Sequence, residues 1–361
     1  MLKVRKSAVV AGAMALGLAL SLGAVLGGAA AGAASPASSA ASHNARPLFV
    51  ALHSARTDVV KNTALPTWQF TYSYNGSNYS ETFVGTNPDT GTSKTIPTYV
   101  IPIKLTSGTF VANPLQTLSN GKTVVGNTLA SPMFKSKIDF VQGGTDLGKT
   151  QYIDAYQRGA LWGVVKTHTS YHVLLGTPTV EPVQSYTVPA NDGGVATDFG
   201  VKVINADINW FDAKAQSLLS SLHIPADSLP IFLVTQTYLT QSGECCIGGY
   251  HNYDGTQAYS AFTYVQTAGV FSQDVSALSH EVGEYVNDPY TNNNSACGIY
   301  EVGDPLEGDA NYGTYPYTLK GFTYHLQDLV TPVYFGAPAS TTVNGWDTFQ
   351  GTSLSVCENG S

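Results

Sequence analysis

The chain has 361 residues, with 17 Lys and Arg against 25 Asp and Glu and a formal net charge of -8 at pH 7. This acidic balance argues against nucleic acid or an anionic membrane as a partner, because both bind through basic patches. Charged residues make up only 12% of the chain, whereas Gly and Tyr are plentiful, a composition that suits an extracellular protein.

The N-terminus has the layout of a secretory signal peptide. A basic start at residues 3–6 is followed by an apolar run over residues 8–34, and Ala31-Gly32-Ala33 offers a small-residue cleavage site. We therefore predict a signal peptide over residues 1–34 and a secreted, extracellular mature chain. An uncleaved membrane anchor is the alternative, because the run is long enough to span a bilayer. No later segment is apolar enough to do so.

The first half of the mature chain is expected to be β-rich. Residues 35–62 are small, polar and aperiodic and predict a flexible linker. In residues 63–198, short runs alternate in hydrophobicity or are rich in β-branched residues, as strands are. The predicted elements of this region are strands over residues 68–72, 98–105 and 171–175, a hairpin turn at Asn75-Gly76, and a helix over residues 150–162.

Residues 199–361 show a more regular order of strands and helices. The predicted elements are strands over residues 200–204, 231–237 and 257–266, a helix capped by Asn209 that runs to about Leu222, and a helix capped by Ser272, with Asp274 in its first turn, that ends before Pro289. The chain is therefore expected to be an α+β protein in which the sheet precedes the last helix.

The four cysteines are Cys245, Cys246, Cys297 and Cys357. In an oxidising compartment an even number predicts two disulfides. A bond between adjacent cysteines is strained, so Cys245 and Cys246 are each expected to pair with Cys297 or Cys357. A zinc–thiolate site is the alternative, although the spacing lacks a C-x-x-C pair.

The strongest functional pattern is the segment SHEVGEYVNDP over residues 279–289. On a helix, His280 and Glu284 lie one turn apart on the same face, so both can bind one metal ion. Glu281 lies about 100° round the helix, where a carboxylate can act as a general base without being a ligand. The apolar residues of the segment gather on the opposite face, which predicts a helix that packs on a core.

A third ligand must come from another segment. Glu301 in the sequence EVGD is the first choice, with Asp304 orienting it or taking its place. His325 is expected to hydrogen-bond a developing oxyanion, and His251, on the loop of the two adjacent cysteines, is an alternative ligand. Such a site would hold a divalent cation, with Zn²⁺ first and Mn²⁺, Fe²⁺ or Ca²⁺ as alternatives, and could activate water for carbonyl hydrolysis.

A simpler interpretation needs no metal. A helix face with His, Glu and Asp is often only the solvated side of an amphipathic helix. Glu301 and Asp304 could belong to a loop turn or to a Ca²⁺ site, and His251 and His325 could be structural. Gly283 favours a functional site, because a helical glycine costs about 1 kcal/mol relative to alanine and indicates a packing or access requirement.

At these residues the chain resembles a family of secreted bacterial proteins. The resemblance is carried by SPMFKSKIDF, TQYIDAYQRGALW, CCIGGYHNY, SHEVGEYVNDP, YEVGDPLEG and GFTYHLQDL, in this order between about residue 98 and Cys357. The chain is more distantly similar to the plant phosphate-induced (Exordium-like) extracellular proteins. It is also similar to the zincin metallopeptidases, in which a sheet precedes a helix bearing H-E-x-x-H, although Glu284 stands where zincins have their second histidine.

The resemblance implies a zincin-like catalytic region over residues 199–361. It assigns His280 and Glu284 as ligands, Glu281 as the general base and Glu301 as the third ligand. The β-rich region before it would form a second lobe, the far wall of the cleft or an inhibitory pro-segment.

The expected function is that of a secreted metal-dependent hydrolase, metallopeptidase-like, acting on an extracellular peptide or cell-wall substrate. One alternative is a non-catalytic binding protein for cell wall or glycan with a structural Ca²⁺. Another is a decayed zincin-like shell that acts by interaction. The sequence indicates no nucleic-acid partner, no membrane association after signal cleavage and no particular oligomeric state.

Overall fold

The computed structural model describes residues 45–52, 64–295, 298–299, 301–306, 313–343 and 345–351. The predicted signal peptide over residues 1–34 lies outside the described residues, as do Cys297 and Cys357. Within the described ranges, no helix combines the length and the apolar character that a bilayer crossing requires.

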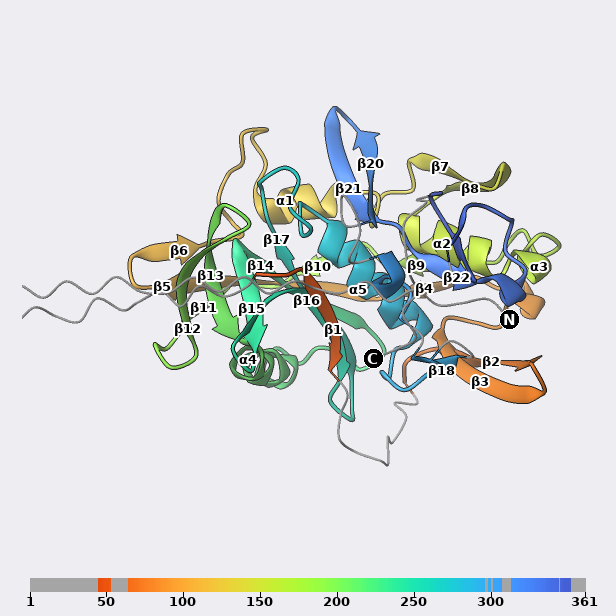
Figure 1. Ribbon diagram of the computed structural model, residues 1–361, viewed down its shortest axis with the longest axis horizontal. Coiled ribbons are helices and arrows are strands. Elements are labelled where there is room, and N and C mark those ends of the chain that lie inside the picture. Colours follow the sequence, from red (N-terminus) through yellow and green to blue (C-terminus); the bar gives the residue numbers. More distant parts are fainter. Residues whose placement is uncertain are drawn as a thin grey trace, which may run out of the picture. The chain divides into compact units, whose positions relative to one another are not determined.

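An eleven-stranded mixed sheet dominates the fold (Figure 1). The order along its main path is β10-β5-β14-β17-β16-β15-β13-β12, and β1, β6 and β11 pair beside this path. The strands are β1 Leu48–Leu52, β5 Thr98–Ser107, β6 Phe110–Ala112, β10 Thr179–Val180, β11 Gln184–Thr187, β12 Gly193–Asp198, β13 Val201–Asp207, β14 Leu229–Thr235, β15 Thr237–Gln241, β16 Glu244–Tyr253 and β17 Ala258–Tyr264. Neighbours from β10 to β17 pair in parallel, whereas β16 runs antiparallel to both β17 and β15. The protein is therefore a mixed α+β protein, as the sequence predicts.

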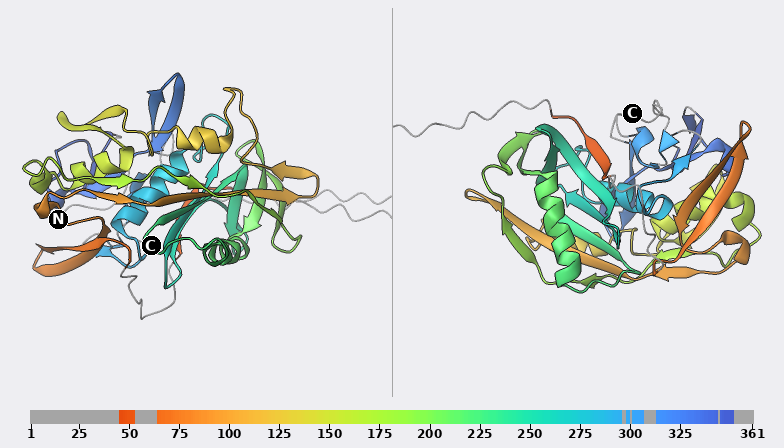
Figure 2. Two further views of the ribbon diagram at one scale, coloured as in Figure 1. Left: turned by 180° about the vertical axis from the view of Figure 1, so that it is seen from behind. Right: turned by 90° about the horizontal axis from the view of Figure 1, so that it is seen from below.

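Two helices cover opposite faces of this sheet (Figure 2). They are α4, Ile208–Ser221, and α5, Ser276–Asn287. Side chains alternate along β14: Ile231 and Leu233 join the core that includes the apolar residues of α5, and Phe232 and Val234 join the core that includes those of α4. Every residue of β14 is buried, which explains its almost uninterrupted apolar sequence, LPIFLVT.

The other elements form small sheets and short helices. They are β2 Thr67–Tyr74, β3 Ser77–Val84, β4 Lys94–Ile96, β7 Ile138–Gln142, β8 Thr145–Thr150, β9 Val173–Leu175, β18 Asn294–Ser295, β19 Gly298–Ile299, β20 Thr314–Leu319, β21 Phe322–Gln327, β22 Val330–Pro332, β23 Thr342–Val343, β24 Trp346–Thr348, α1 Val124–Leu129, α2 Tyr152–Ala160 and α3 Trp162–Val165, with short 3-10 turns that include η2 Asp304–Leu306. Asn75 and Gly76 make the predicted turn of the β2–β3 hairpin, with φ of 49° and 81°.

The large sheet takes strands from both regions distinguished in the sequence. β5 belongs to the predicted β-rich region and pairs in parallel with β14 of the region after residue 199. β1 lies within the expected linker and pairs in parallel with β16. Its sequence is apolar, LFVAL, and Phe49 is buried, so this segment forms a strand instead of remaining an open linker.

The two long helices begin differently from the prediction. Asp207, and not Asn209, caps α4, because its carboxylate accepts hydrogen bonds from the backbone of the first turn. Ser272 does not cap α5, since its hydroxyl donates to the Tyr238 hydroxyl (3.0 Å), and the helix begins only at Ser276. The end of α5 before Pro289 agrees with the prediction.

Cys245 and Cys246 lie in strand β16, where the sequence predicts a loop. They are bonded to each other, which corrects the predicted pairing of each with Cys297 or Cys357. Both side chains are fully buried at the start of the strand. The peptide bond between the two cysteines is cis, and the register of β16 against β15 shifts at this point. Asp198 Oδ2 lies 3.7 Å from Cys245 Sγ.

Candidate metal centre

Helix α5 is buried along its whole length, including the face that carries its charged side chains. His280 and Glu281 are 0% exposed, and Glu284 is 1% exposed. The polar face is therefore not the solvated side of an amphipathic helix, and this simpler interpretation of the sequence is wrong. Burial of ionisable groups is costly unless they are paired or bind a metal, so the neighbouring segments must compensate them.

The Glu284 carboxylate lies between two imidazoles. Its Oε1 atom is 3.0 Å from His280 Nε2, and its Oε2 atom is 3.4 Å from His251 Nδ1. His251 comes from β16, in which Tyr250 packs against Phe211 in the α4 layer. The next residue of a strand points to the opposite face, which directs the His251 side chain toward α5.

The acidic segment EVGD supplies two further carboxylates. Asp304 Oδ1 lies 3.3 Å from His280 Nε2, and the Asp304 side chain is 41% exposed. Glu301 Oε2 lies 4.0 Å from His251 Nε2. Of the predicted ligands, Glu284 and Asp304 thus both lie near His280, whereas Glu301 is grouped with His251 and Glu284; the metal-binding groups found among the described residues do not include Asp304.

Close packing fixes the side chains of this cluster. A Cβ atom on Gly303 would lie 2.5 Å from His280 Cε1, and one on Gly249 would lie 2.6 Å from Glu281 Oε1. Phe49 of β1 stacks on the His280 ring, with centroids 3.9 Å apart. The imidazole is therefore held between a backbone segment and an aromatic ring.

Several nitrogen and oxygen atoms of the cluster are buried without a hydrogen-bond partner in the described part of the chain. This holds for both ring nitrogens of His251 and His280 and for both carboxylate oxygens of Glu281 and Glu301. An unsatisfied buried polar atom costs about 1–3 kcal/mol, and more if it is charged. A divalent cation would satisfy several of them at once, because imidazole nitrogen and carboxylate oxygen are its usual ligands. The buried groups can therefore hold a metal ion.

The pKa values show that burial and mutual repulsion disfavour the ionised carboxylates of Glu281 and Glu301. Burial raises the pKa of Glu281 to about 8, although the facing imidazoles lower it. Burial and the Glu284 carboxylate raise the pKa of Glu301 well above its usual range. Burial disfavours the charged form of His280, but Glu284 and other carboxylates outweigh it and raise the His280 pKa. Protons must balance these charges in the absence of a cation, and a cation would replace them.

His325 lies outside the metal-binding groups found among the described residues. Its Nδ1 atom is 2.7 Å from Asp274 Oδ2, and its backbone N–H donates to Asp274 Oδ1 at 2.9 Å. Asp274 lies just before α5, so this pair ties the ring to the start of the helix. The oxyanion role of His325 stays a prediction.

Gly283 has a packing function in the helix. A Cβ atom there would lie 2.7 Å from Leu329 Cδ1 and 3.1 Å from Leu329 Cδ2. The space that the glycine leaves is filled by a core side chain and not by a ligand, which decides between packing and access as the reason for this residue.

The sequence predicts His251 only as an alternative ligand, whereas the structure places it in the cluster with Glu284 and Glu301. A strand period of two over the run GGYHNY would have placed the His251 side chain on the face opposite its two neighbours. Tyr250 packs in the α4 layer and Asn252 donates to Asp212 of α4 (3.4 Å), so the residue between them must face α5. The assumption that this segment is a loop removed that signal.

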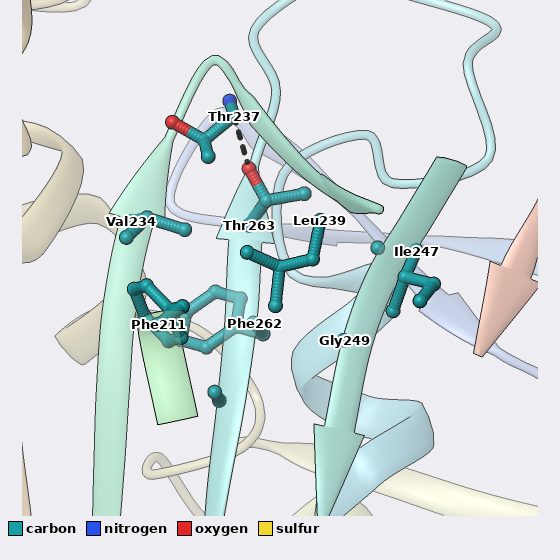
Figure 3. A pocket seen from close by; sticks show the side chains of 10 residues that line it. Phe211, Val234, Thr237, Leu239, Ile247, Gly249, Phe262 and Thr263 are labelled. Atoms are coloured by element: carbon teal, nitrogen blue, oxygen red, sulfur yellow. Dashed lines mark hydrogen bonds between the residues drawn. The ribbon is translucent and has the colours of Figure 1, made fainter. Parts of the chain in front are cut away.

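A buried cysteine group and an uncharged pocket are weaker candidates for a metal site. Asp198, Cys245 and Cys246 form a third buried group within 4.8 Å, but the disulfide leaves no thiolate to bind a metal. The pocket in Figure 3 is lined by apolar or uncharged residues, including Phe211 of α4 and Val234 of β14. It belongs to the core of the α4 layer.

Comparison of the chain with family models, with curated proteins and with solved structures gave no match. The functional assignment therefore depends on the buried cluster around α5.

Proposed function

We propose that this protein is a secreted, divalent-metal-dependent hydrolase of the metallopeptidase type, with an ion held by His280 and Glu284. One observation carries the proposal: the His280 imidazole lies beside the carboxylates of Glu284 and Asp304, and its buried ring nitrogens have no hydrogen-bond partner among the described residues. His280 Nε2 lies 3.0 and 3.3 Å from the two carboxylates. Ligands at about 2.0–2.2 Å from a tetrahedral ion are about 3.3–3.6 Å apart, so the spacing of 3.0 Å between His280 and Glu284 would have to widen slightly to admit a shared ion.

The donor set favours Zn²⁺, with Mn²⁺ or Fe²⁺ as the next choices. Imidazole nitrogen suits these ions, whereas Ca²⁺ takes oxygen ligands. The Glu284 carboxylate shifts the preference toward harder ions than a second histidine in its place would. The presence of imidazole ligands therefore argues against a purely structural calcium site.

The position of the helix supports a zincin-like interpretation of the C-terminal region. Helix α5 packs against β16 and β17, the two strands that precede it in the chain, and these strands are antiparallel. The motif helix of a zincin likewise follows a mixed sheet. In this comparison Glu284 takes the place of the second histidine.

Glu281 is the residue to which we assign proton transfer. Its carboxylate lies in the same buried group as His280 and Glu284, so it could take a proton from a water molecule on a bound ion. Gly249 packs directly against its carboxylate and limits its movement. A divalent ion in the cluster would polarise a water molecule and the substrate carbonyl. Asp304 is the exposed carboxylate beside His280 and marks the side from which a peptide could approach.

His325 is assigned to the oxyanion. Because Asp274 engages Nδ1, the Nε2 atom is the ring nitrogen left to face developing negative charge, and it would donate a hydrogen bond there in the protonated imidazole. His325→Ala should then lower kcat while the metal content stays unchanged.

The test uses the full secreted chain purified without chelator, its metal content and its hydrolysis of a dye-labelled denatured protein. Glu281→Gln should keep the ion and lose turnover by about 10²–10⁴-fold. Glu284→Gln should lose the ion, whereas the exposed Glu244→Gln should change neither property. Calcium as the bound ion would favour the binding protein, and no bound ion the decayed shell. Unchanged turnover in Glu281→Gln would remove that residue from its assigned role.

A further inference from the structure

We propose that the centre contains a second divalent-cation position, formed by His251, Glu284 and Glu301, and that the Glu284 carboxylate bridges two ions. This inference extends the proposed metal centre and rests on it. One donor atom from each of these residues lies within 4.8 Å of the other two, and all three residues are buried. His280, Glu281 and Glu284 form another group with the same property. The two groups share only Glu284.

The two imidazoles do not fit around one ion. In the described ranges, no group within this distance limit contains both His251 and His280. An ion at about 2.0–2.1 Å from two imidazole nitrogens holds them at most about 4.2 Å apart, even when they are opposite each other. One ion therefore cannot bind both imidazoles in this arrangement.

The Glu284 carboxylate has the orientation of a bridge. Oε1 faces His280 Nε2 at 3.0 Å, and Oε2 faces His251 Nδ1 at 3.4 Å. A carboxylate that offers one oxygen to each of two positions holds its ions about 3.5–4 Å apart in two-metal sites. Glu281 Oε2, 3.6 Å from His251 Nδ1, also faces the second position.

Unsatisfied atoms and charge both point to the second ion. Both ring nitrogens of His251 and both oxygens of Glu301 are buried and lack a hydrogen-bond partner among the described residues. When ionised, the carboxylates of Glu281, Glu284, Glu301 and Asp304 carry a formal charge of -4. One divalent ion leaves half of this charge uncompensated in a largely buried cluster, whereas two ions neutralise it.

The experiment measures metal stoichiometry and does not depend on activity. The full chain is stripped of metal, loaded with Zn²⁺, passed through gel filtration and analysed for zinc per chain. We expect about two ions in the wild type and about one in His251→Gln and in Glu301→Gln. His172→Gln is the matched control, because His172 also faces a carboxylate, Asp154 at 2.8 Å, and should leave two ions.

Loading with Mn²⁺ adds a second readout. Two ions bridged by Glu284 should give a spin-coupled electron paramagnetic resonance signal, and His251→Gln should give the signal of an isolated ion. One ion in the wild type, or two in His251→Gln, overturns the second position. One ion with turnover of a labelled protein leaves the proposed hydrolase intact. Two ions without turnover support the second position and contradict the hydrolase.

Discussion

Replacement of Gly303 by alanine tests whether metal binding at the proposed centre depends on the close approach of this segment to His280. The added Cβ atom would lie 2.5 Å from Cε1 and 2.7 Å from Cγ of the imidazole. Carbon atoms in contact are normally about 3.5–4.0 Å apart, so the overlap is about 1 Å. Phe49 stacks on the ring at a centroid distance of 3.9 Å and limits its retreat.

The expected losses of stability and of metal affinity follow from this geometry. Overpacking of this kind costs about 1–3 kcal/mol of stability. Displacement of the ring moves Nε2 away from Glu284, and displacement of Gly303 breaks the hydrogen bond of 3.2 Å that its N–H donates to Glu284 Oε1. Loss of such supporting contacts lowers metal affinity about 10–100-fold, which corresponds to about 1.4–2.7 kcal/mol.

The assay is competition for Zn²⁺ with a chelating dye, together with thermal unfolding of the metal-free and loaded chain. Two glycines provide controls. A Cβ atom on Gly163 would contact nothing within 4 Å, so Gly163→Ala should be neutral. Gly283→Ala overlaps Leu329 and should lose stability while keeping most of its affinity for metal. Wild-type affinity in Gly303→Ala, or an equal loss of affinity in Gly283→Ala, would refute the reasoning.

Three further predictions concern other parts of the molecule. Burial raises the pKa of Glu81 to about 8 from an ordinary 4.5, so the folded chain holds a proton that the unfolded chain loses. Stability from urea unfolding should therefore fall by up to about 1.4 kcal/mol per pH unit as pH rises from about 5 to 8. Glu81→Gln should remove this contribution, and an unchanged slope would contradict it. Proteolysis without reduction should release a peptide containing Cys245 and Cys246 that is lighter than the reduced form by two hydrogen atoms; a bond to another cysteine would contradict the structure. Phe49→Ala uncovers one face of His280 and should speed the loss of metal to a chelator about tenfold or more, whereas an unchanged rate would show that the ring does not protect the centre.

Local patterns predicted individual strands, turns and helices more accurately than the contacts between them. The alternation over residues 68–72, the Asn75-Gly76 turn and the helix before Pro289 all depend on near neighbours in the chain, and the structure confirms them. Helix starts were less accurate, because several polar residues near each start can act as a cap. Tyr238 engages the Ser272 hydroxyl, and this contact is not visible in the local sequence.

The candidate site was predicted in part for the same reason. The spacing of His280 and Glu284 is a property of one helix, and the structure brings their side chains together. A helical projection cannot show whether a polar face meets solvent or another segment. Here it meets His251 of β16 and the EVGD segment, whose positions depend on long-range strand pairing. The pairing of Cys245 with Cys246 was missed because the strain of a bond between adjacent cysteines argues against it.

The central claim is that His280 and Glu284 share a divalent ion, and anomalous X-ray diffraction at the zinc edge tests it most directly. Crystals of the full chain loaded with Zn²⁺ should show an anomalous peak about 2.0–2.2 Å from both His280 Nε2 and a Glu284 oxygen. A peak confined to other residues, or a map with only water between these two side chains, would contradict the claim.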